Sequence, residues 1–132
     1  MPLGRKGLEV AASALAGVSP ADTLYVGLLT DNSAPTSRSE EANAAGYARG
    51  VITFTAGNAP AFVAQQGDDV EITFTANESA IRGMFISTTQ TDASDTAFQN
   101  NIVGYVLGYN LSGIGNGTTV TISNTTLSVS AL

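Results

Sequence analysis

The spacing of apolar residues changes once along the chain, from a helical period to an alternation. Over residues 8–16 they recur at intervals of three and four, the spacing of one face of a helix. Gly17 and Pro20 follow, and both residue types commonly end helices. The spacing predicts one short N-terminal helix, preceded by a flexible basic arm over residues 1–7. The apolar face consists of Leu8, Ala11, Ala12 and Leu15.

From residue 23 onward, apolar and polar residues mostly alternate or form short apolar runs bounded by turn residues, which is typical of β-strands. Polar stretches over 31–45 and 88–101 predict two long loops, and Asn116-Gly117 predicts a tight turn. No regular alternation of strands with helices occurs. We therefore expect an all-β fold, an antiparallel β-sandwich of jelly-roll type, in one domain over residues 8–132. The predicted strands are 23–30, 47–55, 62–63, 70–75, 81–87, 102–109, 118–122 and 126–130.

Composition narrows the possible functions. The 132 residues contain no His, Cys or Trp, which argues against the usual zinc sites, disulfides and Ser–His or Cys–His catalysis. Only 12% of residues are charged, and Thr and Ser on alternate strand positions are expected to solubilise the outer faces instead. The net charge of −6 argues against a nucleic-acid-binding surface. We expect no cofactor, no metal and no membrane span.

Acidic residues supply the candidate chemistry. Asp68, Asp69 and Glu71 could offer oxygen ligands to Ca²⁺, but their spacing fits a solvated turn better. The loop acids could in principle form a glycosidase pair, but nothing in the sequence fixes their separation. For Tyr47 and Arg49 we predict structural roles. Tyr47 is expected to pack at the entry of a strand, and Arg49 is expected to shield a sheet face or to pair with an acid. We expect no catalytic residue and assign partner contact to the basic arm and the two long loops, through Arg5, Lys6, Arg38, Glu40, Glu41, Asp92 and Asp95.

The order of motifs carries more information than any one of them. After the N-terminal helix come Thr23–Thr30 (TLYVGLLT), Glu40-Glu41, Gly46–Arg49 (GYAR), and strands at 51–54, 70–74, 81–86 and 102–109, before a terminal strand at 127–130. This order resembles a family of small virion proteins of tailed bacteriophages, often labelled head-decoration or tail-fibre proteins. In that family a TLYVALFT-like strand, an acidic loop ending in GGGYAR, a V-x-F strand, an I-x-x-x-G-I-F-D strand and an L-x-V-x-L strand follow one another. The resemblance covers nearly the whole chain from residue 8, although loop 88–101 is longer here.

The resemblance implies a non-enzymatic structural protein of the virion. We expect a cement protein on the outer surface of the head, bound to the major capsid protein or other virion proteins. We also expect it to form a homo-oligomer, a trimer in preference to a dimer. Two alternatives remain open: a tail-fibre or baseplate adaptor, and a carbohydrate- or receptor-binding module that uses its Tyr residues and loop acids.

Overall fold

Antiparallel β-strands dominate the structure, a computed structural model that describes residues 23–55 and 63–128. The predicted arm, the N-terminal helix, the turn at 56–60 and the ends of two predicted strands lie outside the described residues. The strands are β1 (Leu24–Leu29), β2 (Gly50–Ile52), β3 (Phe54–Thr55), β4 (Val63–Gln66), β5 (Val70–Thr73), β6 (Ile81–Ser87), β7 (Ile102–Leu111), β8 (Thr119–Ile122) and β9 (Thr126–Ser128). The predicted all-β class is confirmed.

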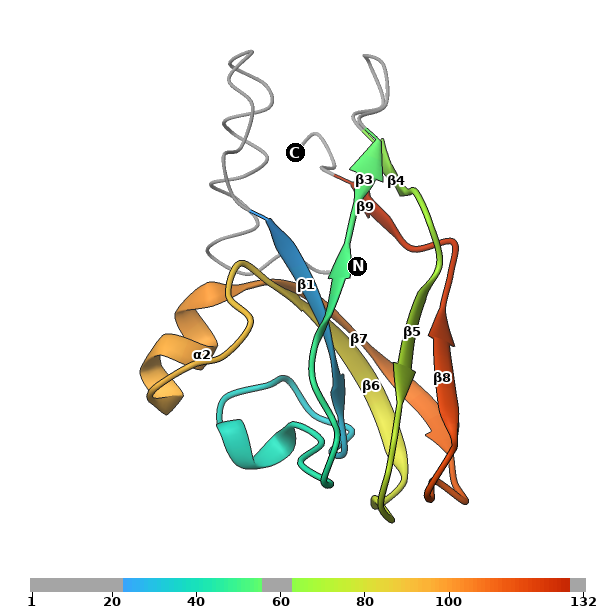
Figure 1. Cartoon of the computed structure of the whole chain (residues 1–132). Coiled ribbons are helices and arrows are strands. Elements are labelled where there is room, and N and C mark those ends of the chain that lie inside the picture. Colours follow the sequence, from blue (N-terminus) through green and yellow to red (C-terminus); the bar gives the residue numbers. More distant parts are fainter. Residues whose placement is uncertain (1–22, 56–62, 129–132) are drawn as a thin grey trace.

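The strands form one larger sheet and two smaller ones (Figure 1). The larger sheet has the order β2-β1-β6-β7, and the smaller sheets have the orders β3-β4-β9 and β5-β8. All pairings are antiparallel. Because β4 leads into β5 and β8 leads into β9, the two smaller sheets continue each other along the same side of the molecule (Figure 1).

The main core lies between the larger sheet and strands β5 and β8. The alternation in β5 and β8 is regular, with buried Val70 and Ile72 facing buried Val120 and Ile122 across the pair. These side chains pack against Val26, Leu28, Met84 and Ile86 of the larger sheet. Alternation in the sequence thus correctly identifies the buried face of these strands.

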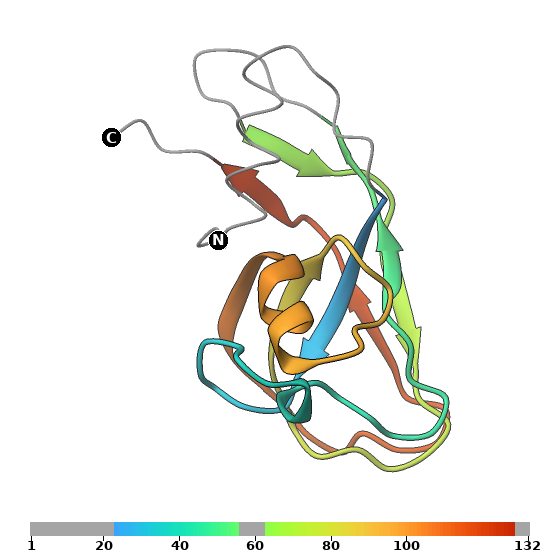
Figure 2. The same cartoon turned by 90° about the vertical axis from the view of Figure 1, so that its left-hand side faces the viewer.

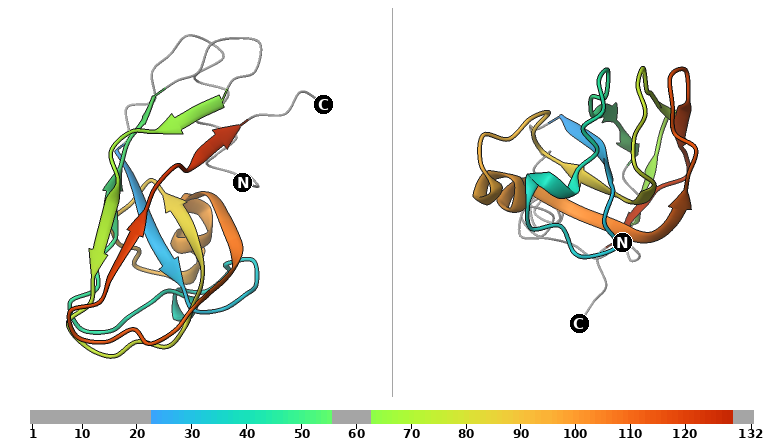
Figure 3. Two further views of the ribbon diagram at one scale, coloured as in Figure 1. Left: turned by 90° about the vertical axis from the view of Figure 1, so that its right-hand side faces the viewer. Right: turned by 90° about the horizontal axis from the view of Figure 1, so that it is seen from below.

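The outer face of the larger sheet carries a second, smaller core. Leu29, Phe85 and Ile102 pack there against Phe98. Phe98 belongs to helix α2 (Asp95–Asn101), which lies over this face together with the 3-10 turn η1 (Arg38–Glu40) (Figures 2 and 3). The sheet is therefore covered on both sides.

Helix α2 corrects the prediction that residues 88–101 form only a loop. It begins after Ser94, whose hydroxyl accepts a hydrogen bond from the backbone N–H of Ala97 (3.1 Å), an N-cap contact. Seven residues with a single buried apolar side chain, Phe98, give almost no helical periodicity to detect. Tertiary packing of Phe98 against the sheet supplies the stability that the pattern does not show.

The predicted strand at 47–55 is also too long at its start. Strand β2 begins only at Gly50, and Thr53 interrupts the run before β3. Tyr47 and Arg49 precede the strand because their side chains enter a polar cluster instead of the alternating pattern of a sheet. At the other end of the fold, β7 continues to Leu111, two residues beyond its predicted end.

Candidate functional site

The two long loops meet over the outer face of the larger sheet, where a buried arginine joins them. We call this group the Arg49 cluster: Arg49, Glu41, Asp92, Tyr47 and Thr89. The first loop, which in the structure extends to residue 49, provides Glu41, Tyr47 and Arg49, and the second provides Thr89 and Asp92. The structure thus brings together residues that are 40 or more positions apart in the sequence.

The guanidinium of Arg49 uses all three of its nitrogens. Nε and Nη2 donate to the two carboxylate oxygens of Glu41, each at 2.8 Å, which is a bidentate pair. Nη2 also donates to Asp92 Oδ2 at 2.8 Å, and Nη1 donates to the backbone carbonyl of Thr89 at 2.8 Å. One side chain therefore binds two carboxylates and a carbonyl from both loops.

The cluster is nearly sealed from water. The side chain of Arg49 is 2% exposed, that of Asp92 1% and that of Glu41 13%. Burial alone would lower the pKa of the Arg49 guanidinium, but the hydrogen bond and charge of Glu41, followed by those of Asp92, raise it above its ordinary value. Arg49 therefore stays charged, and its attraction to the two acids offsets part of the cost of burying them.

Asp92 is saturated with donors. Its Oδ1 accepts hydrogen bonds from Thr89 Oγ1 (2.7 Å) and Asn101 Nδ2 (2.9 Å), while Oδ2 binds Arg49. Burial would raise the pKa of Asp92, but these hydrogen bonds, those from Asn101 and Thr89 first, hold it below its ordinary value. Since Asn101 is the last residue of α2, the same carboxylate ties the helix to the loop before it.

Tyr47 connects the cluster to the edge of the sheet. Its hydroxyl accepts a hydrogen bond from the backbone N–H of Leu28 (3.0 Å) and donates one to Glu41 Oε1 (2.9 Å). Burial, and after it the charge of Glu41, raise the pKa of the Tyr47 hydroxyl above its ordinary value. β2 pairs with β1 only as far as Val26, so it offers no acceptor to the backbone N–H of Leu28. The Tyr47 hydroxyl accepts that hydrogen bond instead.

Two aromatic rings surround the guanidinium. The guanidinium carbon of Arg49 lies 4.9 Å from the centre of the Phe85 ring and 5.8 Å from that of Phe98, within cation–π range. The two rings pack edge to face with centres 5.3 Å apart. Gly27 makes room for Phe85, because a Cβ at position 27 would lie 2.4 Å from the end of that ring.

A second ion pair lies at the exposed rim of the same region. Arg38 donates to Asp95 Oδ1 through its backbone N–H (3.0 Å) and its Nε (3.3 Å), and both side chains are about half exposed. Its Nη1 donates to the carbonyl of Asp92 at 3.2 Å. The N–H of Arg38 and then its side chain lower the pKa of Asp95. Glu40 lies beside this pair and accepts hydrogen bonds from the backbone and hydroxyl of Thr36.

The predicted contact residues therefore fall into three groups. Arg38, Glu40 and Asp95 form an exposed or half-exposed rim, which we call the loop rim. Glu41 and Asp92 point inward to Arg49 and hold the loops together. The remaining two, Arg5 and Lys6, lie outside the described residues.

Arg49 does pair with acids, one of the two roles predicted for it. The sequence gives no sign of the involvement of Thr89 and Asn101, because neutral polar residues in a polar loop form no pattern. The turn acids Asp68, Asp69 and Glu71 are all exposed. Within residues 23–55 and 63–128, no group of three or more acidic side chains could hold a metal ion.

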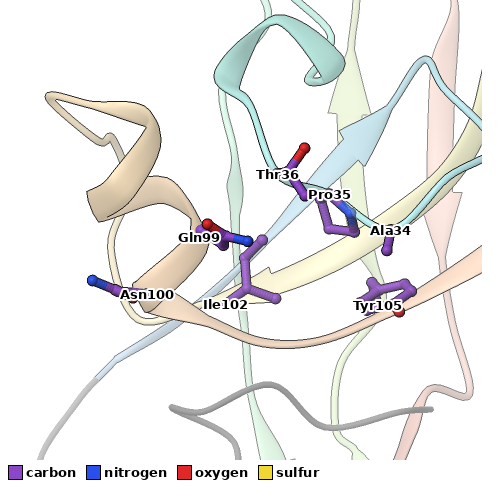
Figure 4. Close-up of a pocket in the computed structure, with 7 residues that line it drawn as sticks. All are labelled: Ala34, Pro35, Thr36, Gln99, Asn100, Ile102 and Tyr105. Atoms are coloured by element: carbon purple, nitrogen blue, oxygen red, sulfur yellow. The ribbon is translucent and has the colours of Figure 1, made fainter.

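A pocket of about 460 Å³ lies between the first loop, α2 and β7 (Figure 4). Pro35 and Ile102 provide apolar walls, Tyr105 provides an aromatic one, and the amide of Gln99 points toward Ile102. All seven lining residues are uncharged. Its volume falls within the range of small-molecule sites, about 300–1,000 Å³.

In comparisons with known proteins, no protein-family model, curated protein or solved structure matches the chain. Among the helices that the structure describes, none is long and apolar enough to cross a membrane.

Proposed function

We propose that this chain is a non-enzymatic structural protein of a tailed-bacteriophage virion, a jelly-roll-like cement protein on the head surface. The order of motifs from Thr23–Thr30 to the last strand supports the virion role, through the family resemblance described above. Its partners are the major capsid protein or other virion proteins, and several copies act together as a homo-oligomer. Repetition of a weak contact across an oligomer then provides avidity.

The observation that carries the proposal is the way the Arg49 cluster holds the loop rim. Glu41 and Asp92 accept hydrogen bonds from Arg49, Tyr47 and Thr89, so their carboxylates serve to fix the two loops. Arg38 and Asp95 are bonded to each other at the surface above. A rim that is already ordered loses less conformational entropy on binding than a mobile loop. Such a surface suits non-covalent attachment.

Electron microscopy of the particle tests the location. We expect tagged chains to decorate the head in many copies, whereas a few copies at one vertex or along the tail would support the tail-adaptor alternative. Purified protein should also rebind to particles that lack it. Particles to which the chain does not bind at either place would refute the virion role.

Variants test which surface makes the contact. We expect Arg38→Glu to lower capsid occupancy, because it places a third acid beside Asp95 and Glu40 and makes the net charge of the rim more negative. Asp68→Lys is the matched control, since it changes one charge on an exposed turn outside the rim. Deletion of residues 1–7 tests the arm, and unchanged occupancy would remove it from the contact surface.

The pocket beside Tyr105 supports one second candidate, binding of a neutral saccharide. Its aromatic wall suits the apolar face of a sugar ring, and the Gln99 amide can both donate to and accept from hydroxyl groups. A glycan array measures this directly. Loss of the signal in Gln99→Ala would favour saccharide binding in this pocket. Gln90→Ala is the control and should keep the signal, because Gln90 is exposed and lies outside the pocket.

A further inference from the structure

Among the residues that the structure describes, one flank leaves the main core partly uncovered. Strand β7 is the last strand of the larger sheet, and β8 has β5 as its one neighbour among the described strands. A groove of about 210 Å³ opens between them, with Leu28 and Met84 at its floor. In the view from below, β7 runs toward β8, to which residues 112–118 connect it (Figure 3).

The rim of this groove carries exposed apolar side chains. Tyr109 is 37% exposed and Leu111 is 41% exposed, and both line the groove from β7. Proteins usually protect an edge strand with charged residues, but the ten residues of β7 contain none. The groove and the strand end together form a mostly apolar surface, which we call the open flank: Tyr109, Leu111, Val120 and Ile122 over Leu28 and Met84. The hydroxyl residues Thr121, Ser123 and Thr125 also line the groove.

Charge indicates what can cover the open flank. The chain has a net charge of −6, so two copies repel each other over most of their surfaces. Every residue that lines the groove is uncharged. One charged residue of each sign lies beside the lining: Arg82 donates a hydrogen bond to the side-chain oxygen of Asn110, between Tyr109 and Leu111, and Glu71 pairs across the strands with Thr121. Contact through the groove lining therefore brings uncharged residues of one copy against uncharged residues of a second copy, so the lining itself places no acid against another acid.

We propose that the open flank is a two-fold contact between copies of this chain, in which Tyr109 and Leu111 of each copy enter the groove of the other. A two-fold contact uses the same patch on both copies, as this one does, and closes after two subunits. It therefore gives a dimer rather than the expected trimer. The proposal rests on the homo-oligomer of the proposed function but does not require the particle.

Light scattering of the purified full chain measures the contact. We expect a mass of twice 13.4 kDa for the wild type and 13.4 kDa for Leu111→Glu, which places two acids against each other in the dimer. Val51→Glu is the matched control: Val51 is 55% exposed on β2, at the opposite edge of the same sheet. This variant should keep the dimer mass. Circular dichroism confirms that both variants are folded.

Cross-linking adds a readout of symmetry, because the chain contains no cysteine. Leu111→Cys should form a disulfide-linked dimer on oxidation, and Val51→Cys should remain a monomer on a denaturing gel. A monomeric wild type, a dimer that survives Leu111→Glu, or a trimer would each overturn the proposal. If the wild type is a monomer and Leu111→Glu lowers its stability, another segment of the same chain covers the open flank instead. Capsid occupancy is measured separately, so failure of the dimer does not count against attachment to the particle.

Discussion

Arg49→Met removes the guanidinium from the Arg49 cluster while it keeps most of the apolar length of the side chain. Glu41 and Asp92 would then remain buried without their cation, with side-chain exposures of 13% and 1%. Both acids keep some neutral donors, from Tyr47 and Thr89. Neutral donors do not replace the opposite charge, so the variant should be strongly destabilised.

The size of the effect follows from the degree of burial. Loss of one partner from a buried ion pair costs about 3–5 kcal/mol. For a chain of this length each kcal/mol lowers Tm by about 3 °C, so Arg49→Met should lower Tm by about 10–15 °C. Addition of Glu41→Gln and Asp92→Asn to Arg49→Met should recover part of the loss, because the triple variant buries no charge.

Urea unfolding followed by circular dichroism and tyrosine fluorescence measures these free energies; the chain has four Tyr and no Trp. Arg38→Met is the control, because it breaks an exposed ion pair that water already screens, and it should change stability far less. A loss below about 1 kcal/mol for Arg49→Met would match an ordinary surface pair. That result would refute the view that this cluster holds the two loops.

Three further changes probe the same region. Gly27→Ala should cost about 1–3 kcal/mol in urea unfolding, since its Cβ would meet the buried Phe85 ring at 2.4 Å, and a normal midpoint would contradict this packing. Ser94→Ala removes the N-cap of α2 and should cost about 1 kcal/mol, which thermal melts can detect beside a Ser33→Ala control. The folded-state pKa of Asp92 lies below its unfolded value of about 3.9, so its stabilisation is complete above that pH and is lost as pH falls toward the folded-state value. Asp92→Asn should flatten this acid dependence, and parallel wild-type and variant curves would count against it.

Much of the β-structure could be predicted because the alternation of apolar and polar residues along a strand shows which face of the strand is buried. Val70, Ile72, Val120 and Ile122 occupy the core as their spacing indicates. Helix α2 could not be predicted, since one buried side chain, Phe98, carries its packing. The pattern of apolar residues within one element indicates which of its side chains are buried. It does not indicate which distant segments of the chain those side chains contact.

The candidate site illustrates the same limit. The sequence marks Glu41 and Asp92 as loop acids, and Arg49 as a residue that shields a face or binds an acid. It does not show that all three meet, because the pairs are 8 and 43 residues apart. The fold of the larger sheet decides which loop acids turn inward and which, such as Asp95, remain at the surface.

The sequence separations within the Arg49 cluster also bear on the order of folding. Arg49 and Glu41 leave the ribosome long before Asp92, because a chain is synthesised from its N-terminus. Phe85 and Phe98, which enclose the guanidinium, also come from the later part of the chain. Contacts between distant segments close slowly, since the loop-closure entropy is lost before the contact forms. The first loop therefore reaches its final structure only after helix α2 has been synthesised, so completion of the fold depends on residues in the last third of the chain.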